Sequence, residues 1–226
     1  MSKKKSKNPS IKKEESYHKK PVYSFFKRFF DILLSFIAIV LLSPIFLIFI
    51  IIQLIATKGH PVFADLRVGK GGKDIRVLKF RTMVYDAETN IDDYLTRKQK
   101  REWKKERKVD DDPRVTKFGK FLRKTSIDEL PQLFNIFAGS MSIVGYRPMT
   151  RDELLRNFKK EERETLFLAK PGLTGYWQVS GRNNVSFESG ERQKLELESV
   201  YLRGFWFDVK VAFKTIPTVL SRKGSK

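Results

Sequence analysis

Two adjacent carboxylates, Asp128 and Glu129, are the residues of this chain best suited to chemistry. They stand in the run T-S-I-D-E-L-P-Q, within a chain whose net charge is +20. A carboxylate pair in cationic surroundings can bind Mg²⁺, attack phosphorus as a nucleophile or accept a proton. The competing interpretation is structural, because Ser126-x-x-Glu129 matches a helix capping box. The spacing alone favours the capping box.

The position of a nearby proline bears on that choice. A helix capped at Ser126 would carry Pro131 at its fifth position, where proline is disfavoured. A helix beginning nearer Leu130 would leave both carboxylates at its N-terminal end, where free amides and the positive end of the dipole favour bound anions. The residues alone leave both alternatives open.

Composition excludes several other kinds of site. The 226 residues include no cysteine and two histidines, His18 and His60, which lie far apart in the sequence. Disulfides, thiolate nucleophiles and cysteine zinc sites are therefore excluded, and a histidine-based triad or metal cluster is disfavoured. The 46 basic residues against 26 acidic ones predict a polyanionic partner, which is nucleic acid, anionic lipid or a phosphorylated substrate.

A long apolar segment must hold the domain that carries the carboxylates. Residues 1–30 are strongly basic and predict a disordered cytoplasmic tail. Residues 31–57 are almost wholly apolar, and at about 1.5 Å per residue such a helix is long enough for a bilayer. Ser43-Pro44 interrupts it near the midpoint. Proline removes a backbone donor, and the Ser43 hydroxyl is placed to satisfy a carbonyl freed by the break.

Basic residues flank this anchor on both sides, so the positive-inside tendency places both of its ends in the cytoplasm. A re-entrant helix-break-helix satisfies both this arrangement and the break at Ser43-Pro44. A kinked transmembrane helix is the alternative, since proline is tolerated in membrane helices. Residues 58–221 are then expected to form a small cytoplasmic domain, and residues 222–226 a tail.

The cytoplasmic domain is predicted to be mixed α/β and mainly helical. Pro61–Gly69 and Lys73–Met83 are expected to form two strands of a β-hairpin around Gly71-Gly72. Thr116–Lys124 mixes phenylalanine with lysine and arginine, as interfacial amphipathic helices do. An aromatic-rich helix near the C-terminus is expected to divide its side chains between the core and the membrane interface.

Six motifs appear in order along the chain: K-F-R-T-M (Lys79–Met83), D-P-R-V-T-x-F-G (Asp112–Gly119), T-S-I-D-E-L-P-Q (Thr125–Gln132), M-S-I-V-G-x-R-P (Met141–Pro148), P-G-L-T-G-x-W-Q-V-S-G-R (Pro171–Arg182) and F-D-V-K (Phe207–Lys210). Together they resemble the bacterial sugar transferase family, the monotopic polyprenyl-phosphate phosphoglycosyl transferases. The resemblance covers roughly residues 25–220 and tips the anchor toward re-entry. Ser140 replaces the aspartate that the family usually carries, and Tyr146 replaces a proline. We expect these departures to alter a substrate-facing loop.

The resemblance implies transfer of a sugar 1-phosphate from a UDP-sugar to a polyprenyl phosphate, undecaprenyl phosphate, with release of UMP. It implies that Asp128 forms a covalent phosphosugar intermediate and binds Mg²⁺, and that Glu129 assists the acceptor. It also makes Pro171–Arg182 a donor-binding loop. Asp208 would either orient a cation of the site or close a structural ion pair. The remaining expected substrate contacts are Lys79, Arg81, Arg147, Pro148, Gln178 and Arg182.

The expected location is the inner (cytoplasmic) membrane, with the catalytic domain on the cytoplasmic face. The expected partners are the UDP-sugar, undecaprenyl phosphate and membrane lipids, without nucleic acid.

A polyprenyl-dependent glycosyltransferase is an alternative and would release UDP. A membrane-tethered nucleic-acid-binding protein is another, motivated by the charge but without a helix-turn-helix or a base-stacking surface. An inert scaffold for polysaccharide assembly is the third. The sugar, the polymer (capsule, exopolysaccharide or another glycan) and a homo-oligomeric state stay open.

Overall fold

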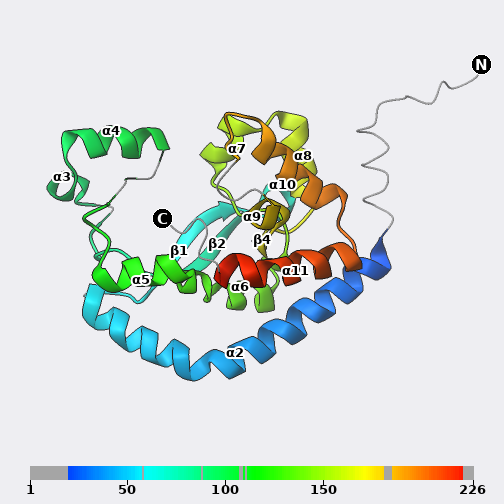
Figure 1. Ribbon diagram of the computed structural model, residues 1–226, viewed down its shortest axis with the longest axis horizontal. Helices are drawn as coiled ribbons and strands as arrows, with labels where there is room; N and C mark the ends of the chain where they lie inside the picture. Colours follow the sequence, from blue (N-terminus) through cyan, green and yellow to red (C-terminus); the bar gives the residue numbers. More distant parts are fainter. Residues whose placement is uncertain are drawn as a thin grey trace, which may run out of the picture. The chain divides into compact units, whose positions relative to one another are not determined.

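The computed structural model describes residues 20–57, 59–87, 89–106, 109, 111–180 and 185–220. The predicted mixed, mainly helical α/β class is confirmed (Figure 1). The basic tail 1–19 and the tail 222–226 lie outside the described residues. The elements are α2 (Pro21–Thr57), β1 (Val62–Val68), η1 (Lys70–Gly72), β2 (Asp74–Phe80), α3 (Ile91–Tyr94), α4 (Arg97–Glu106), α5 (Lys117–Thr125), η2 (Ile127–Glu129), α6 (Gln132–Ala138), β3 (Ser142–Val144), α7 (Arg151–Asn157), α8 (Lys160–Phe167), β4 (Gly172–Thr174), α9 (Tyr176–Ser180), α10 (Glu191–Tyr201) and α11 (Phe205–Leu220).

The described residues form two compact units. Unit 1 comprises the described parts of Met1–Ile39, Leu66–Val77 and Gln132–Gly224. Unit 2 comprises the described parts of Val40–Asp65 and Leu78–Pro131. The division passes through α2 and through the hairpin β1–β2, so both units use part of each element.

Helix α2 runs without interruption through the apolar segment (Figure 1). It begins at Pro21 rather than at residue 31, so the assignment of residues 21–30 to a disordered tail was wrong. The predicted break at Pro44 is not a break in the helix. Pro44 cannot donate to the carbonyl of Val40, and the Ser43 hydroxyl donates to that oxygen instead, at 2.8 Å. The predicted role of Ser43 is therefore confirmed, and it explains why the helix continues.

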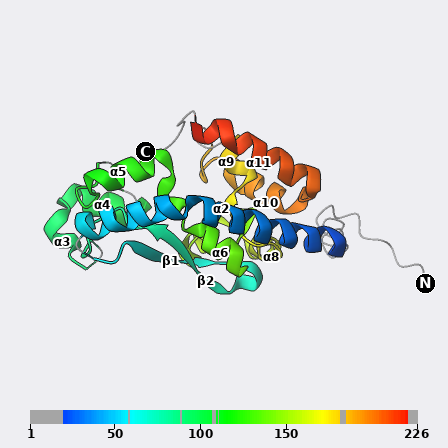
Figure 2. The ribbon, with the colours of Figure 1, turned by 90° about the horizontal axis from the view of Figure 1, so that it is seen from below.

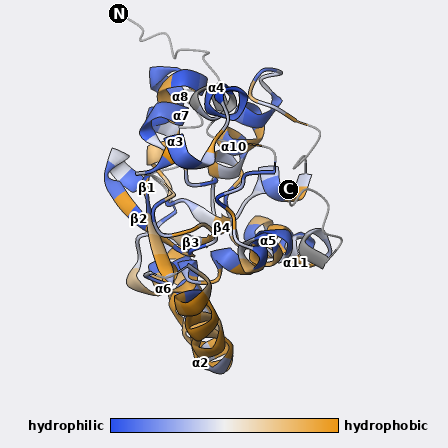
Figure 3. Cartoon of the chain, turned by 90° about the vertical axis from the view of Figure 1, so that its left-hand side faces the viewer, coloured by the Kyte–Doolittle hydropathy of each residue, from blue (hydrophilic) through white to orange (hydrophobic). Residues whose placement is uncertain are grey.

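The apolar side chains of α2 are mostly exposed, and Figure 3 shows the helix as hydrophobic over most of its length. Leu41 is 71% exposed and Ile55 is 76% exposed, which is unlike the core helix of a soluble domain. Among the described residues, α2 is long and apolar enough to cross a membrane by length and composition.

The predicted β-hairpin is confirmed as β1 and β2, which lie side by side in Figures 1 and 2. Gly71 and Gly72 both have φ of +71°, a left-handed conformation that favours glycine at the turn. The Gly69 amide donates to the Lys73 carbonyl at 2.8 Å and closes the loop.

Unit 1 has a compact hydrophobic core beside a short parallel sheet. β3 pairs with β4 in parallel, with Ser142 opposite Gly172 and Val144 opposite Thr174. Three-residue strands carry little sequence periodicity, and they were not predicted. The buried side chains of this core are Val68, Tyr146, Met149, Leu154, Phe158, Leu166 and Val200.

Unit 2 is held by aromatic contacts and by α5. The Phe49 ring packs edge-on against Phe80 and Phe118, with centroids 5.9 and 5.7 Å apart. Leu122 of α5 is fully buried, while Phe121 on the same helix is 48% exposed. The predicted amphipathic helix over Thr116–Lys124 is thus present as α5, one residue displaced.

Candidate functional site

The carboxylate pair lies in a short turn that α5 positions. The Thr116 hydroxyl caps the start of α5 by accepting from the Gly119 amide at 2.9 Å. The helix ends at Ser126, whose φ of +57° is left-handed. Asp128 and Glu129 then follow in the 3₁₀ turn η2. The end of α5 and this turn therefore fix the main chain that carries both carboxylates.

The capping box that the spacing favoured is not formed. Ser126 is instead the residue that ends α5, and its side chain makes no capping hydrogen bond to the turn that follows. A left-handed residue there reverses the chain before a new helix can begin. Glu129 is consequently not occupied as a capping partner of Ser126.

Asp128 is half-buried in a mixed electrostatic environment. Burial raises the pKa of its carboxyl to about 6, and the adjacent charge of Glu129 acts in the same direction. The positive charges of Lys79 and Arg123 oppose the rise. The carboxylate is thus ionised at neutral pH but less stabilised as an anion than a solvated aspartate.

Two cations from different elements of unit 2 face Asp128. Lys79, at the end of β2, was predicted, and its ammonium lies 3.9 Å from the Asp65 carboxylate. Arg123 of α5 was treated as part of an interfacial rim, so sequence reasoning missed it. Its Nε donates to the Thr82 hydroxyl at 2.8 Å, and burial lowers the pKa of its guanidinium while Asp128 opposes that fall.

A glycine sets how closely α5 approaches the chain after β2. A Cβ on Gly119 would lie 2.0 Å from the carbonyl oxygen of Thr82, which is far inside contact distance. The Thr116 amide donates to the same carbonyl at 3.0 Å. Only glycine permits this approach, which keeps Arg123 within reach of Thr82.

The chemistry of this turn fits a magnesium ion that is shared with a substrate. The described residues contain no group of three or more His, Cys, Asp and Glu side chains able to hold a metal by themselves. Mg²⁺ commonly binds one or two carboxylates together with substrate phosphates and water. Asp128, the predicted metal ligand, could supply the protein's share of such a site.

Arg81 is engaged by main-chain carbonyls at the base of the hairpin. Its Nε donates to the His60 carbonyl at 2.8 Å, and a terminal nitrogen donates to the Tyr85 carbonyl at 3.3 Å. The guanidinium also lies 5.2 Å from the centroid of the Tyr85 ring. The phosphate contact predicted for Arg81 stays a prediction. The structure shows in addition that the Arg81 side chain holds main-chain carbonyls in place.

The other predicted contacts belong to unit 1, or lie outside the described residues in the case of Arg182. Arg147 and Pro148 follow β3, and the Arg147 guanidinium lies 5.8 Å from the Trp177 ring centroid. Gln178 of α9 donates to the Leu173 carbonyl at 3.4 Å. Its side-chain oxygen is buried without a hydrogen-bond partner in the described part of the chain.

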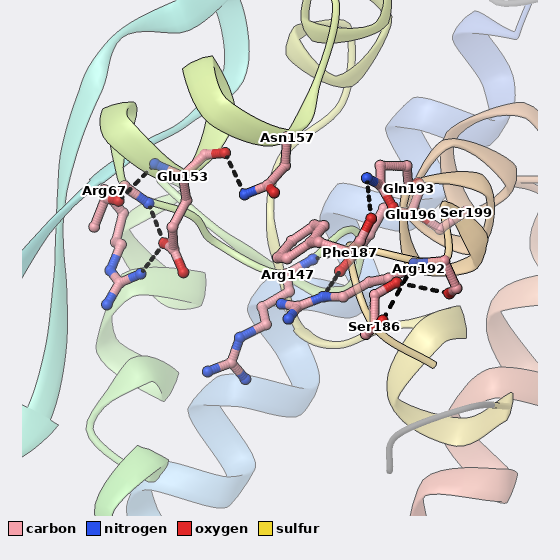
Figure 4. Close-up of polar contacts among 12 residues, drawn as sticks. Arg67, Arg147, Glu153, Asn157, Ser186, Phe187, Arg192, Gln193, Glu196 and Ser199 are labelled. Atoms are coloured by element: carbon pink, nitrogen blue, oxygen red, sulfur yellow. Dashed lines mark hydrogen bonds and ion pairs between the residues drawn. The ribbon is translucent and has the colours of Figure 1, made fainter. Parts of the chain in front are cut away.

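Two residues of α10 join Arg147, and sequence reasoning missed them both (Figure 4). Glu196 is fully buried and accepts from the Arg147 main-chain amide at 3.0 Å. The guanidinium of Arg192 lies 4.0 Å from the centroids of both the Trp177 and the Phe187 rings. The i, i+4 spacing of Arg192 and Glu196 was the available signal, but it is common on solvated helices.

Burial sets the electrostatics of this second cluster. It raises the pKa of Glu196 to about 7, against the opposing charges of Arg192 and Arg147. It lowers the pKa of Arg192 to about 10, where Glu196 opposes the fall and Arg147 adds to it. The Arg192 Nε is 3.9 Å from a Glu196 oxygen.

Gly172 and Gly175 of the predicted donor-binding loop serve backbone packing. A Cβ on Gly172 would lie 2.1 Å from the Gly145 nitrogen, and one on Gly175 would lie 2.3 Å from the Gly145 oxygen. The close approach is therefore between two segments of unit 1. Gly145 fills the space beside Gly172 and Gly175.

Asp208 forms an ion pair with Lys27 of α2, which matches the second of its two predicted roles. Its carboxylate is 2.5 Å from the Lys27 ammonium and accepts from the Tyr23 hydroxyl at 2.7 Å. Asp31 is also used structurally within unit 1, where it accepts from the Ser142 hydroxyl and the Ile143 amide at 3.1 and 3.0 Å.

The two departures from the family pattern, Ser140 and Tyr146, both contact other residues of unit 1. Tyr146 is fully buried in the core of unit 1, where its hydroxyl lies 3.4 Å from the Val68 carbonyl. The Ser140 hydroxyl exchanges hydrogen bonds with Asn135 at the end of α6. The expectation that these departures alter a substrate-facing loop stays a prediction.

Comparison with known proteins now decides the family. A family model described as bacterial sugar transferase matches residues 22–222. The chain belongs to the bacterial sugar transferase family. The match includes the carboxylate turn, the Arg147 cluster and helix α2.

Named relatives of this family act on undecaprenyl phosphate or serve polysaccharide production. The chain is 37% identical to the exopolysaccharide production protein ExoY of Rhizobium meliloti, over 96% of each chain. It is 39% identical to the undecaprenyl-phosphate galactose phosphotransferase of Salmonella typhimurium, over 89% of this chain but 42% of the relative. It is 36% identical to an N-acetylgalactosaminephosphotransferase of Aeromonas hydrophila that is named for UDP-N-acetylgalactosamine and undecaprenyl phosphate, over 91% and 46%.

The chain therefore spans less than half the length of the latter two relatives and nearly all of ExoY. The sugars in the printed names differ between relatives. Family membership and the exposed apolar helix α2 together indicate a membrane location.

Proposed function

We propose that the chain transfers a sugar 1-phosphate from a UDP-sugar to undecaprenyl phosphate, with release of UMP, as the first membrane step of polysaccharide or glycan assembly. The observation that carries this proposal is the half-buried Asp128 carboxylate, beside Glu129 and facing the charges of Lys79 and Arg123. With a pKa of about 6, it is ionised at neutral pH and more basic than an ordinary aspartate. The names of the relatives support the substrate class.

The proposed reaction has two steps at one phosphorus atom. A carboxylate oxygen of Asp128 attacks the β-phosphorus of the UDP-sugar, and the bond from that phosphorus to the bridging oxygen breaks, so UMP leaves. An oxygen of undecaprenyl phosphate then attacks the aspartyl phosphosugar, and the bond to Asp128 breaks. The products are UMP and an undecaprenyl diphosphate sugar, and Asp128 is regenerated. Glu129 accepts a proton from the acceptor phosphate or orients it.

Cationic side chains have the supporting role. Phosphoryl transfer depends mainly on positioning and on stabilisation of charge on the phosphoryl oxygens. Lys79 and Arg123 face Asp128 and are the best-supported contacts for the transferred phosphate. Arg147 is proposed as a further phosphate contact, and Arg81, Pro148, Gln178 and Arg182 stay predicted substrate contacts.

Asp128 would hold Mg²⁺ together with the diphosphate. When bound, the ion neutralises phosphate charge that would otherwise repel the carboxylate. The half-buried acids and the lack of a third acidic ligand in the described chain are consistent with an ion that arrives with the nucleotide.

We further propose that α2 is a re-entrant anchor of the inner membrane, which kinks at Pro44 without ending the helix, and that it holds the carboxylates on the cytoplasmic face. The acceptor phosphate lies at the depth of the lipid headgroups, so the acids must reach that depth. Exposed aromatic side chains such as Trp206 and Phe213 of α11 support contact with the interface. Basic residues before and after the apolar run support a cytoplasmic position for both ends.

The activity is tested with purified full-length protein in detergent, a panel of UDP-sugars, Mg²⁺ and undecaprenyl phosphate. We expect wild-type protein to release UMP with at least one donor, and Asp128→Asn to lose on the order of 10³-fold or more of that rate. Asp111→Asn is the matched control, because Asp111 is an exposed acid of the same unit. Release of UDP instead of UMP would establish the glycosyltransferase alternative, and full activity of Asp128→Asn would refute the nucleophile.

The topology is tested by labelling single cysteines, since the chain has none of its own. Ser24→Cys and Lys70→Cys place exposed thiols before and after the apolar run of α2. A re-entrant anchor predicts that an impermeant maleimide labels both in inside-out vesicles and neither in right-side-out cells. Labelling from opposite sides would identify a spanning helix.

A further inference from the structure

A second charged cluster, in unit 1, has more positive than negative charge. Arg147 and Arg192 carry two guanidinium groups, and both lie over the ring of Trp177. Glu196 is the carboxylate that contacts them. Glu153, which also influences Glu196, is already paired with Arg67 at 2.9 Å (Figure 4).

Glu196 is bound in a specific way. The carboxylate is fully buried, and burying a charge is costly unless it is hydrogen-bonded and paired. One oxygen accepts from the Arg147 main-chain amide. The other oxygen has no hydrogen-bond partner in the described residues and lies 3.9 Å from the Arg192 Nε. The carboxylate therefore anchors the main chain at Arg147, and Arg192 is the cation beside its other oxygen.

Arg192 is held between two aromatic rings rather than by hydrogen bonds of its Nε. The faces of Trp177 and Phe187 lie at equal distances of 4.0 Å from its guanidinium carbon. Such stacking is a favourable cation–π arrangement that arginine fits better than lysine. The Trp177 ring that contacts Arg192 also lies beneath the Arg147 guanidinium, with its centroid 5.8 Å from the guanidinium carbon.

The consequence for Arg147 is that its side chain has no carboxylate partner in the described residues. Glu196 binds its main chain rather than its guanidinium, and the like charge of Arg192 disfavours collapse of the Arg147 side chain onto Glu196. An arginine with a fixed main chain, a ring beneath its guanidinium and no paired acid is suited to bind an external anion.

We propose that Glu196 and Arg192 are positioning residues for Arg147: Glu196 fixes the main chain, and Arg192 fixes the Trp177 ring, so that the Arg147 guanidinium is presented to a phosphate group of a substrate. This inference rests on the proposed function, which supplies the phosphorylated donor and acceptor. The chemistry that is recognised, a phosphate oxyanion, is common to both substrates.

Steady-state kinetics of the full-length protein in detergent test the inference, with UMP as readout. We expect Glu196→Ala to lower kcat/KM by roughly 10- to 100-fold, mainly through a higher KM for one of the two substrates. The KM for the UDP-sugar and the KM for undecaprenyl phosphate are measured separately, which identifies the phosphate that Arg147 binds. Glu191→Gln is the matched control, because it removes an exposed acid of the same helix and should leave both constants unchanged.

Conservative variants keep the test decisive if Glu196→Ala does not fold. Glu196→Gln retains an acceptor for the Arg147 amide, so we expect partial retention of activity, with a loss of about threefold to tenfold. Arg192→Lys keeps the charge but loses the planar stack, and we expect about a tenfold rise in the affected KM. Thermal unfolding of each variant establishes that the protein remains folded during the assay.

A double-mutant cycle separates positioning from general stability. If Glu196 and Arg192 act through Arg147, then Glu196→Gln and Arg192→Lys should change kcat/KM by less than twofold when Arg147 is already alanine. The inference would be overturned by additive losses of kcat/KM in the Arg147→Ala background, or by wild-type KM values in folded Glu196→Gln and Arg192→Lys. In either case, UMP release by the wild-type protein would still uphold the proposed function. Absence of UMP release by wild-type protein would overturn both.

Discussion

Asp128 in unit 2 and Glu196 in unit 1 are both acids whose pKa is raised by burial, to about 6 and about 7, yet their surroundings differ. Glu196 is fully buried, accepts from a main-chain amide and lies against a stacked arginine. Asp128 is half-buried in a 3₁₀ turn and forms no ion pair with another described side chain, although Lys79 and Arg123 face it. Glu196 is thus bound to the main chain of its own protein, whereas Asp128 is left available to a substrate.

A third acid extends the comparison within unit 2. Asp112 forms a buried pair with Arg114, with a shortest contact of 2.6 Å. Burial is the largest influence and acts to raise the pKa of Asp112, but the hydrogen bonds and charge of Arg114 outweigh it and hold that pKa below its usual value. Acids of one unit can thus be tuned in opposite directions. The raised one that lacks a paired cation is the better candidate for chemistry.

The largest change in activity is expected from a substitution of Glu129, the residue next to Asp128. Glu129→Gln should lower turnover by roughly 10²- to 10³-fold, because it removes a proton acceptor from the second step. Protein-bound sugar phosphate should accumulate, since Asp128 can still attack. Single-turnover experiments with a radiolabelled sugar measure both quantities. Equal loss of UMP release and of labelled protein would place Glu129 in the first step instead.

A smaller change, with a pH signature, is expected at Arg123. Its positive charge lowers the pKa of Asp128, so Arg123→Gln should raise that pKa and move the acid limb of the activity profile to higher pH. We expect roughly tenfold less activity at pH 6 and a milder loss at pH 8. Lys117→Gln is the control, because Lys117 is exposed on the same helix. An unchanged pH profile in Arg123→Gln would remove Arg123 from the site.

The free energy of unfolding should distinguish Asp128, which has no ion-pair partner among the described residues, from Asp112, which is paired with Arg114. The raised pKa of Asp128 means that its protonated form stabilises the fold below about pH 4, and that this stabilisation is lost as pH rises through about 6. At pH 8, Asp128→Asn should therefore raise stability by about 1 kcal/mol, after allowance for solvent screening. Asp112→Asn should lower it by about 3 kcal/mol, because Arg114 loses its buried partner. Denaturant unfolding in detergent measures both, and destabilisation by Asp128→Asn would contradict this view of the site.

The smallest effect is expected inside the membrane helix. Ser43→Ala removes the donor that satisfies the Val40 carbonyl beside Pro44, and it should cost about 1 kcal/mol or less. Ser43→Ala combined with Pro44→Ala should recover that loss, because alanine at 44 restores a main-chain donor. Thermal unfolding of the wild-type protein, the single variant and the double variant in the same detergent measures these changes. If Ser43→Ala is as stable as the wild-type protein, water replaces the Ser43 hydroxyl at the Val40 carbonyl.

The sequence was sufficient where the signal is local. Apolar run length predicted the membrane helix, and the glycine pair with its flanking strands predicted the hairpin. The Ser43 hydrogen bond followed from proline chemistry. The start of α2 was missed because Lys27 and Arg28 look like a charged flank, whereas tertiary contacts bind both inside unit 1.

The candidate site was predictable only in part, for the same physical reason. Asp128 and Glu129 were identified through a motif, and Lys79 through the family resemblance. The Arg192–Glu196 cluster could not be found, because Glu196 acts on Arg147 across 49 positions of sequence and no spacing encodes that contact. The capping box failed because Ser126 adopts a left-handed conformation that its residue type does not require.

The binding of the first turns of α2 into unit 1 has a practical consequence for anyone who wants a water-soluble version of this enzyme. Deleting residues 21–57 would remove the Lys27 partner of Asp208, and it would leave the Ser142 hydroxyl and the Ile143 amide without the acceptor that Asp31 provides. A shortened protein would thus lack supports of the very segment that leads to Arg147. Inhibitor screening and crystallisation should therefore use the intact chain in nanodiscs, and a truncated protein that expresses well but is inactive would say nothing about catalysis.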